Sequence, residues 1–425
     1  MKRLVVTMLG KAVRRMAQLR GGSGSALPGL FVEKIHPNFI RDTLASLPYG
    51  VAIVSGTNGK TTTTKMVVEL LESQGLTVFT NRTGSNFTRG VAAALLGEVD
   101  SRGRLEADIA VLELDEAHAV HFVRSVQPRY ALLLNVMRDQ LDRFGEIDTT
   151  AKMLQTIASS TRDRVILNRD DPRLASTRFR EPIGARISTY GSSEAIKHKF
   201  PSDDVMRAEK IPQSHETFVQ DDTELVNFEG RQAKIRFAKN ECAATLKIGG
   251  VYNVINAVGA VSLTRAIIGE KLDVEAMIRA LENVSPAFGR GETLMIQGQP
   301  CELILVKNPS GFRLALQSFP PEGYATMIAV NDNYADGRDM SWLWDVDFES
   351  LRETGVSHVT GTRATDMALR LKYDLIEVPN IESNLSTALN SFLESQGPTR
   401  IYCTYTAMLQ LRRLIAKKTA VEKVR

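Results

Sequence analysis

A glycine, a lysine and a threonine follow one another at Gly59, Lys60 and Thr61, inside the segment VAIVSGTNGKTTTTKMVVEL at residues 51–70. The backbone N–H groups of such a turn, followed by the N-terminus of a helix, form a site for an anion. The Lys60 ammonium would place a charge on the outer phosphates of a nucleotide, and the Thr61 hydroxyl would bind Mg²⁺. These residue types in this order predict a nucleotide-binding loop.

The match to the general phosphate-loop pattern is incomplete, because Val54 stands where the pattern has its first glycine. Gly-Lys-Thr occurs often by chance, so the prediction depends on the flanking strand and helix and on Gly56, which supplies the turn. The residues predicted to bind nucleotide here are Gly56, Thr57, Asn58, Gly59, Lys60, Thr61 and Thr62.

Acidic residues follow a second apolar run, ADIAVLELDEAH at residues 107–118. Because parallel strands end at the same edge of a sheet, Glu113 is expected beside the phosphate loop. Mg²⁺ prefers carboxylates together with phosphate oxygens and water, so Thr61 and Glu113 are the predicted magnesium ligands. For Asp115 and Glu116, capping of the following helix is an alternative interpretation.

A mostly parallel α/β sheet is needed to position these residues. From residue 48 onward, short apolar runs alternate with helical stretches, which predicts this architecture. Strands are expected at 50–54, 77–80, 107–112, 130–134 and 164–167, and helices at 62–73 and 150–158. Residues 190–247 are first polar and then strand-like, and we interpret them as a small β-rich insertion.

A second, smaller α/β unit of Rossmann-like type is expected after Pro286. Its alternation predicts strands at 302–306, 325–330, 356–360 and 400–403, and helices at 311–317 and 365–371. The expected domains are a basic N-terminal helix and lead-in at 1–46, a nucleotide-binding domain at 47–285 and the second α/β domain at 286–425.

The composition argues against several classes of protein. The 425 residues carry a net charge of only +4, with 24% charged residues and no long basic block, so no nucleic-acid partner is expected. Cys242, Cys301 and Cys403 are far apart and form neither a zinc-binding nor a disulfide pattern, so we expect no zinc.

The N-terminal segment MKRLVVTMLGKAVRRMAQLR has apolar residues on one side of a helix and arginine or lysine elsewhere. Its apolar run is interrupted too early for a secretory signal, and no membrane-spanning segment is expected in the rest of the chain. Two interpretations of this basic amphipathic helix stay open, docking on its own domain or contact with an anionic membrane surface.

Motifs of the first unit resemble the ATP-binding central domain of the Mur ligases. The segments are GTNGKTTT at 56–63, VLELDE at 111–116, LLLNVMRDQLDRFGEID at 132–148, VILNRDDP at 165–172 and GGVYNVINAVGA at 249–260. The resemblance implies that Lys60 and Thr61 contact ATP phosphates and Mg²⁺ and that Glu113 binds Mg²⁺. It also implies that Asn256 recognises the adenine and that Arg290, in FGRGE, reaches ATP.

Motifs of the second unit are similar to the C-terminal domain of the MurT family, the ligase-like subunits of lipid II isoglutaminyl synthase. They are VKNPSGFRLAL at 306–316, AVNDNYADGRDMSWLWDVDFE at 329–349 and VTGTRATDMALRLK at 359–372. The resemblance implies that Asp339 completes the catalytic triad of a GatD-like glutaminase partner and orients its histidine. From the residues alone, Asp339 is more simply a helix cap or a loop acid.

The chain also departs from these families. Several MurT proteins have a four-cysteine zinc ribbon in the central domain, and only Cys242 lies near that region here. Gln140 stands where conventional Mur ligases have a histidine, and no lysine falls where their carbamylated residue is expected. The phosphate loop comes too early for their separate UDP-binding domain, which is consistent with a lipid-linked substrate.

The expected function is ATP-dependent carbon–nitrogen ligation with glutamine as amido donor, in peptidoglycan biosynthesis. The α-carboxylate of D-isoglutamate in the lipid II stem peptide would be amidated through an acyl phosphate, with ATP and Mg²⁺ as cofactors. The expected catalytic residues are Lys60, Glu113 and Asp339. The chain would form a heterodimer with the glutaminase in the cytoplasm, with peripheral contact at the inner face of the membrane.

Two alternatives stay open. A stand-alone ligase of the Mur or folylpolyglutamate synthetase type would add an amino acid and would need no partner. A nucleotide-binding scaffold without catalysis would retain its function when Lys60 is replaced.

Overall fold

The computed structural model describes residues 9–11, 14, 26–81, 87–138, 147–200, 222–285, 290–395 and 397–419. By their contacts the described residues fall into two compact units. The first comprises Met1–Val136, Asp148–Lys247 and Asn253–Val284, and the second Met137–Ile147, Ile248–Tyr252 and Ser285–Arg425. The domain boundaries given by the sequence analysis stay predictions.

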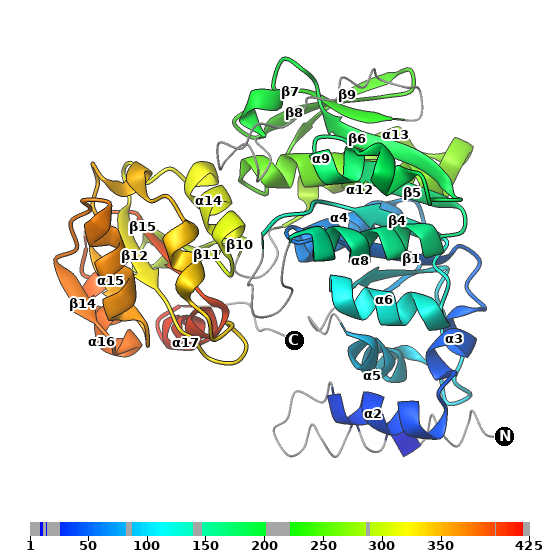
Figure 1. Ribbon diagram of the computed structural model, residues 1–425, viewed down its shortest axis with the longest axis horizontal. Coiled ribbons are helices and arrows are strands. Elements are labelled where there is room, and N and C mark those ends of the chain that lie inside the picture. The colour runs from blue at the N-terminus through cyan, green and yellow to red at the C-terminus, as the bar shows by residue number, and fades with distance from the viewer. Residues whose placement is uncertain are drawn as a thin grey trace. The chain divides into compact units, whose positions relative to one another are not determined.

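The first unit is built on a nine-stranded sheet in the order β2-β3-β1-β4-β5-β6-β7-β8-β9 (Figure 1). Neighbours from β2 to β7 are parallel, and β7, β8 and β9 are joined antiparallel. The strands are β1 Gly50–Ser55, β2 Val78–Thr80, β3 Ile109–Glu113, β4 Tyr130–Leu133, β5 Arg164–Asn168, β6 Arg186–Ser192, β7 Thr223–Glu229, β8 Gln232–Phe237 and β9 Asn240–Thr245.

Strands β3, β1 and β4 are neighbours inside this sheet, with β2 on one side of them and β5 on the other. Every residue of β3 and β4 is buried, which explains their uninterrupted apolar sequences, because a central parallel strand is covered on both faces. Val54 near the end of β1 pairs in register with Glu113 at the end of β3. The loop that follows β1 and the acidic end of β3 therefore lie at the same edge of the sheet.

The α-helices of the first part of the chain cover this sheet and its edge (Figure 1). Helix α4 packs on β1, β2 and β3, α13 packs on α4 and β9, and α2 packs on α5. Their bounds are α2 Ala26–Ile35, α3 Phe39–Leu44, α4 Lys60–Ser73, α5 Thr88–Glu98, α6 Glu116–Ser125, α8 Ile147–Ser160, α9 Pro172–Ala175, α10 Thr177–Arg180, α12 Val251–Ile268 and α13 Val274–Asn283.

The segment Val251–Lys271, which includes α12, is long and apolar enough to cross a membrane by composition alone. It passes by length and composition only, so the expectation that no segment spans a membrane stays a prediction. In the structure, 67% of its apolar window is buried inside the protein, as in the core helix of a globular domain.

The second unit has a six-stranded sheet in the order β10-β11-β15-β12-β13-β14, parallel except for the pair β10 and β11. Its strands are β10 Arg290–Ile296, β11 Gln299–Leu305, β12 Ala325–Ala329, β13 His358–Thr360, β14 Asn380–Glu382 and β15 Thr399–Cys403. Its helices are α14 Pro309–Ser318, α15 Ala364–Tyr373, α16 Leu385–Phe392 and α17 Tyr405–Ile415, with short 3₁₀ turns at Ser341–Asp345 (η3) and Glu349–Leu351 (η4).

The expected fold class is confirmed, and each strand and helix range cited from the sequence has a counterpart in the structure. Residues 190–247 contain β7, β8 and β9, which extend the large sheet at its edge instead of forming a sheet of their own. In the second unit, the strands β10 and β14 and the helix α16 were not predicted from the sequence. The exposed residues of β14 have no apolar pattern that would predict a strand.

Little of the predicted N-terminal basic helix lies within the described residues. Of these, Lys11 donates a hydrogen bond from Nζ to Val99 O at 2.5 Å, and Gly10 is buried against Leu96 and Val32. At these residues the segment rests on the first unit. Contact with a membrane surface stays a prediction.

Candidate active site

The predicted nucleotide-binding loop joins the end of β1 to the first residue of α4. Gly56 and Gly59 have φ angles of 136° and 89°, which residues with a side chain rarely adopt. A Cβ atom on Gly59 would also lie 2.5 Å from Nδ2 of Asn256. The loop therefore requires glycine at both positions, and the N–H groups at the start of α4 suit an anion.

Asn135, just after β4, fixes the conformation of this loop. Its Oδ1 accepts a hydrogen bond from Asn58 N at 2.9 Å, and its Nδ2 donates to Asn58 O at 3.0 Å. Its backbone oxygen also accepts a hydrogen bond from Thr57 N at 3.1 Å. Asn135 lies in a segment that resembles the Mur ligases, but this role of its side chain was not predicted from the sequence.

Replacing Asn135 with alanine is expected to weaken Mg·ATP binding by about 30-fold, because the two side-chain hydrogen bonds that hold Asn58, each about 1 kcal/mol, are lost. Calorimetric titration of the purified chain measures this change. The matched control is Asn283→Ala, which removes an exposed asparagine at the end of α13. Equal affinities for the Asn135 variant and the wild type would contradict the assignment.

Thr61 and Lys60, at the start of α4, each contact one carboxylate. One of these carboxylates is at the end of β3 and the other is shortly after it. Thr61 Oγ1 donates a hydrogen bond to Glu113 Oε1 at 2.8 Å, and Lys60 Nζ lies 3.3 Å from Glu116 Oε2. Lys60 and Glu116 are 5% and 2% exposed, so they form a buried ion pair. Nζ of Lys60 also donates to Gly56 O at 2.5 Å.

The contacts of Asp115 and Glu116 show whether these two acids cap the helix that follows β3. Asp115 occupies the N-cap position of α6, but its side chain makes no capping hydrogen bond. Glu116 is the first helical residue, and its carboxylate is turned to Lys60.

The residues around Glu113 fit a magnesium ion with nucleotide phosphates. Asn81 fixes the backbone of Glu113 through two hydrogen bonds, from Asn81 Nδ2 to Glu113 O at 2.7 Å and from Glu113 N to Asn81 Oδ1 at 3.0 Å. The hydroxyl of Thr61 and the carboxylate of Glu113 are hard oxygen donors of the kind that Mg²⁺ prefers. In addition, the Thr62 hydroxyl is buried and has no hydrogen-bond partner within the described part of the chain.

Asn256 and Arg290, both predicted to bind nucleotide, are placed differently. Asn256 lies in α12, is 5% exposed, and its amide group faces Gly59 of the loop. Arg290 is the first residue of β10 in the second unit, and its side chain lies outside the described residues. The adenine contact of Asn256 and the ATP contact of Arg290 stay predictions.

Asp171, in the VILNRDDP segment, supports the neighbouring strand end. Its Oδ2 accepts a hydrogen bond from Val136 N at 2.6 Å, and its Oδ1 accepts from Arg173 N at 2.9 Å and Leu174 N at 3.1 Å, at the N-terminus of α9. Val136 follows Asn135, so Asp171 also supports the residue that holds the loop. Burial raises the pKa of the Asp171 carboxyl group to about 6.

This raised pKa predicts a pH dependence of stability. The folded state binds a proton on Asp171 more tightly than the unfolded state, so this group makes folding less favourable as the pH rises from about 4 to 6. Relative to the wild type, Asp171→Asn should gain about 2 kcal/mol of unfolding free energy between pH 4 and pH 7. Urea unfolding at a series of pH values measures the difference. Asp273→Asn, at the exposed N-cap of α13, is the control, and a flat difference for Asp171→Asn would contradict the prediction.

Asp339 lies in the loop after β12 and precedes η3. Its Oδ1 accepts a hydrogen bond from Ser341 N at 2.9 Å, and this bonding to Ser341 lowers the pKa of the carboxyl group, which keeps it ionised. The N-cap residue of η3 is Met340, so this contact is that of a loop acid, one of the two interpretations that the residues alone suggested. Its proposed role toward a partner stays a prediction.

The loop that carries Asp339 is fixed to the rest of the second unit by Asp336, which is 2% exposed. Asp336 Oδ1 accepts a hydrogen bond from Thr406 N at 2.7 Å, and its Oδ2 accepts bonds from the Thr406 hydroxyl and from Asn333 N. Tyr334, between these two contacts, is 89% exposed. The exposed ring of Tyr334 and the carboxylate of Asp339 therefore lie on a loop that the hydrogen bonds of Asp336 hold in place.

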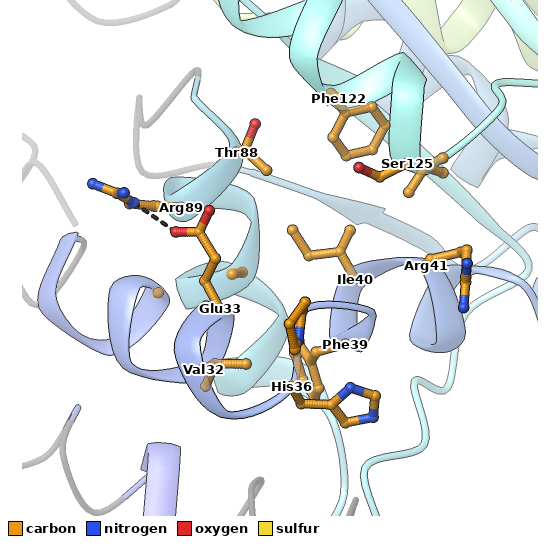
Figure 2. Close-up of a pocket in the computed structure, with 14 residues that line it drawn as sticks. Val32, Glu33, His36, Phe39, Ile40, Arg41, Thr88, Arg89, Phe122 and Ser125 are labelled. Carbon is orange, nitrogen blue, oxygen red and sulfur yellow. Dashed lines mark hydrogen bonds and ion pairs between the residues drawn. The ribbon is translucent and has the colours of Figure 1, made fainter.

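A pocket of about 80 Å³ lies elsewhere in the first unit, among α2, α3, α5 and α6 (Figure 2). Its wall includes Val32, Ile40 and Phe122, and Arg89 at its border is paired with Glu33 at 2.7 Å. None of the predicted site residues lines this pocket, so we assign it no part in the nucleotide site.

Two predictions from the sequence, on Gln140 and on the absence of a zinc site, cannot be followed over the whole chain. Gln140, at the position of the Mur ligase histidine, lies outside them. No three histidine, cysteine, aspartate or glutamate side chains gather as a metal site in the described ranges, which omit residues 201–221.

Comparisons with known proteins identify the family and the fold. A family model described as Mur ligase middle domain matches residues 54–264, and one described as MurT ligase C-terminal matches residues 305–408. Among solved structures, MurF from Acinetobacter baumannii superposes with a TM-score of 0.67 at 20% identity, covering 91% of this chain and 81% of that one. Folylpolyglutamate synthase from Mycobacterium tuberculosis, solved with ADP, gives a TM-score of 0.65 at 15% identity, covering 90% and 93%.

The fold is therefore that of the Mur ligases. Among curated proteins, the MurT subunit of lipid II isoglutaminyl synthase (glutamine-hydrolyzing) from Streptococcus pneumoniae R6 is 32% identical over 95% of each chain. The corresponding subunit from Staphylococcus aureus COL is 28% identical over 96% of each chain. The chain belongs to the MurT family.

Proposed function

We propose that this chain is the ATP-dependent ligase subunit of a lipid II isoglutaminyl synthase and acts in peptidoglycan biosynthesis. The observation that supports it most is the pairing of Lys60 and Thr61 with Glu116 and Glu113 beside the glycine loop. This arrangement suits phosphoryl transfer. The substrate is inferred from the names of the MurT relatives, which match both halves of the chain.

The reaction has two steps. The α-carboxylate of D-isoglutamate in the stem peptide attacks the γ-phosphate of ATP, which gives an acyl phosphate and ADP. Ammonia then attacks the acyl carbon, the bond to the phosphate oxygen breaks, and the proton lost by nitrogen ends on the phosphate, which leaves as hydrogen phosphate. Phosphorylation is needed because a carboxylate oxygen is too poor a leaving group to be displaced by ammonia directly.

The residues of the first unit have separate tasks in the first step. The loop N–H groups and Lys60 bind the phosphates and offset the charge that develops during transfer. Thr61 and Glu113 would hold Mg²⁺, which when bound neutralises phosphate charge. Asn256 is the proposed adenine contact and Arg290 a further ATP contact.

We further propose that ammonia comes from a GatD-like glutaminase subunit that binds the second unit as a heterodimer. The relatives are named as subunits of a glutamine-hydrolyzing enzyme, which supports a partner of this activity. The exposed Tyr334 and the ionised Asp339 would face that partner. Ammonia released nearby would reach the acyl phosphate at a high local concentration.

The proposed place of action is the cytoplasm, at the inner face of the cell membrane, because the reaction uses ATP and a lipid-linked acceptor. The N-terminal basic segment would make the peripheral contact.

Reconstitution tests the function. The chain is co-expressed with a glutaminase subunit and assayed on purified lipid II with ATP and either glutamine or an ammonium salt. Mass spectrometry should show the loss of about 1 Da that converts a carboxylic acid to an amide, with both nitrogen sources. Without the glutaminase, only the ammonium salt should serve. Coupling of a free amino acid by the chain alone would instead indicate a stand-alone ligase.

A further inference from the structure

The buried carboxylate of Glu116, at the start of α6, has no task in the reaction described above. Glu116 is 2% exposed, and its Oε2 lies 3.3 Å from Nζ of Lys60. It is the first residue of α6, three positions after the predicted magnesium ligand Glu113. Two consecutive residues of α4 are thus connected to two carboxylates, Thr61 to Glu113 and Lys60 to Glu116.

We propose that Glu116 is a positioning residue that determines where the Lys60 ammonium stands during phosphoryl transfer. The proposal rests on the proposed function, because it assigns a task within the same ATP site. Glu116 acts through Lys60 and does not itself contact the nucleotide.

The contacts of Lys60 indicate which of its bonds change when phosphates bind. In this structure Nζ lies 2.5 Å from Gly56 O and 3.3 Å from Thr57 O, both carbonyl oxygens of the phosphate loop, in addition to Glu116 Oε2. An ammonium group has three protons in rotatable directions, so phosphate oxygens can take the place of carbonyl oxygens.

The bond to Glu116 is the one that should persist. A neutral carbonyl oxygen loses little when its cationic partner moves, whereas a buried carboxylate that loses its counter-charge becomes strongly unfavourable. Release of Lys60 would leave the Glu116 carboxylate buried and uncompensated by that ammonium, next to the negative charge of the phosphates. We therefore expect Lys60 to exchange loop carbonyls for phosphate oxygens while it stays bonded to Glu116.

Neutralising the acid with Glu116→Gln tests this inference with little change in side-chain volume. The full-length chain with its glutaminase partner is supplied with lipid II, ammonium salt and varied ATP. The expected result is a fall in kcat of about 10-fold to 100-fold, because Lys60 is no longer held at the transferring phosphate. KM for ATP should change by less than about 3-fold, since the loop N–H groups still bind the phosphates.

A double-mutant cycle separates positioning from a general structural effect. In a Lys60→Ala background, Glu116→Gln should have almost no further effect on kcat, because the residue through which Glu116 acts is gone. Asp115→Asn, at the neighbouring N-cap with no side-chain capping bond, is the matched control and should leave kcat unchanged. Thermal unfolding of each variant checks the fold.

Several results would overturn the proposal. One is tighter ATP binding with an unchanged kcat in Glu116→Gln, which would mean that the carboxylate competes with phosphate for Lys60. Another is an equal loss of kcat with and without Lys60. If the glutamine variant does not fold, Glu116→Asp keeps the charge but withdraws it by one methylene, and a kcat loss that depends on Lys60 is then required. A wild-type complex without ATP-dependent amidation would contradict the proposed function instead.

Discussion

Lys60→Ala is expected to lower the rate of ATP-driven amidation of lipid II by about 10²-fold to 10³-fold, the range observed when one preorganised charge-stabilising donor is removed from an active site. Lys60 is the buried cation of the phosphate loop, with Nζ directed to the loop oxygens of Gly56 and Thr57. The proposed function requires that this charge reach the transferring phosphate. Initial rates with ammonium salt measure the loss without any contribution from glutamine hydrolysis.

The matched control is Lys65→Ala, one turn further along α4, where the lysine is partly exposed and lies 3.8 Å from Glu69. It removes a positive charge from the same helix but should leave the rate within about twofold, as expected of an exposed ion pair. If the Lys60 variant lost ATP binding but retained its biological function in cells, the chain would be a nucleotide-binding scaffold and not a ligase.

Asp339→Asn is expected to abolish amidation from glutamine while amidation from ammonium salt continues. An aspartate that orients a catalytic histidine is worth about 10⁴-fold in a hydrolytic triad, and the amide cannot stabilise the charged histidine in the same way. The low pKa of Asp339, caused by its hydrogen bonds with Ser341, keeps the carboxylate available for this task at neutral pH. Glutaminase activity of the complex is the direct measurement.

Asp347 provides a control with the same local geometry. Its Oδ1 accepts a hydrogen bond from Glu349 N at 2.9 Å ahead of η4, as Asp339 Oδ1 does from Ser341 N ahead of η3. Asp347→Asn therefore measures how much stability is lost when such a hydrogen bond is weakened. It should have no effect on glutamine hydrolysis. Unchanged hydrolysis in Asp339→Asn as well would mean that Asp339 is only a loop acid.

The sequence predicts the architecture well where burial dictates it. The apolar runs of β1, β3 and β4 are long because these strands are covered on both faces. The glycines at positions 56 and 59 indicate a turn whose backbone has positive φ angles. The weaker signals belong to elements that are stabilised by their neighbours. Strand β14 is mostly exposed and pairs only with β13 among the described strands. Its sequence therefore shows no alternation of apolar and polar residues that would predict a strand.

The supporting residues of the site were harder to predict for a related reason. Asn135 and Asn81 act through amide groups that bond backbone atoms of other segments, at Asn58 in the loop after β1 and at Glu113 in β3. Glu116 is one of three acids in a short segment, and its burial and its contact with Lys60 distinguish it from Asp115. Such contacts depend on which strand ends are adjacent in the sheet, and residue types alone do not contain this information.

The hydrogen bonds of Asp336, which hold the Asp339 loop in place, have a thermodynamic consequence for assembly. Asp336 already fixes the segment to Thr406, so a subunit that recognises Asp339 would meet a preformed surface. Association would then carry little cost for ordering this loop, and its heat-capacity change would report the burial of apolar surface, such as the exposed ring of Tyr334, with no contribution from coupled folding of the loop.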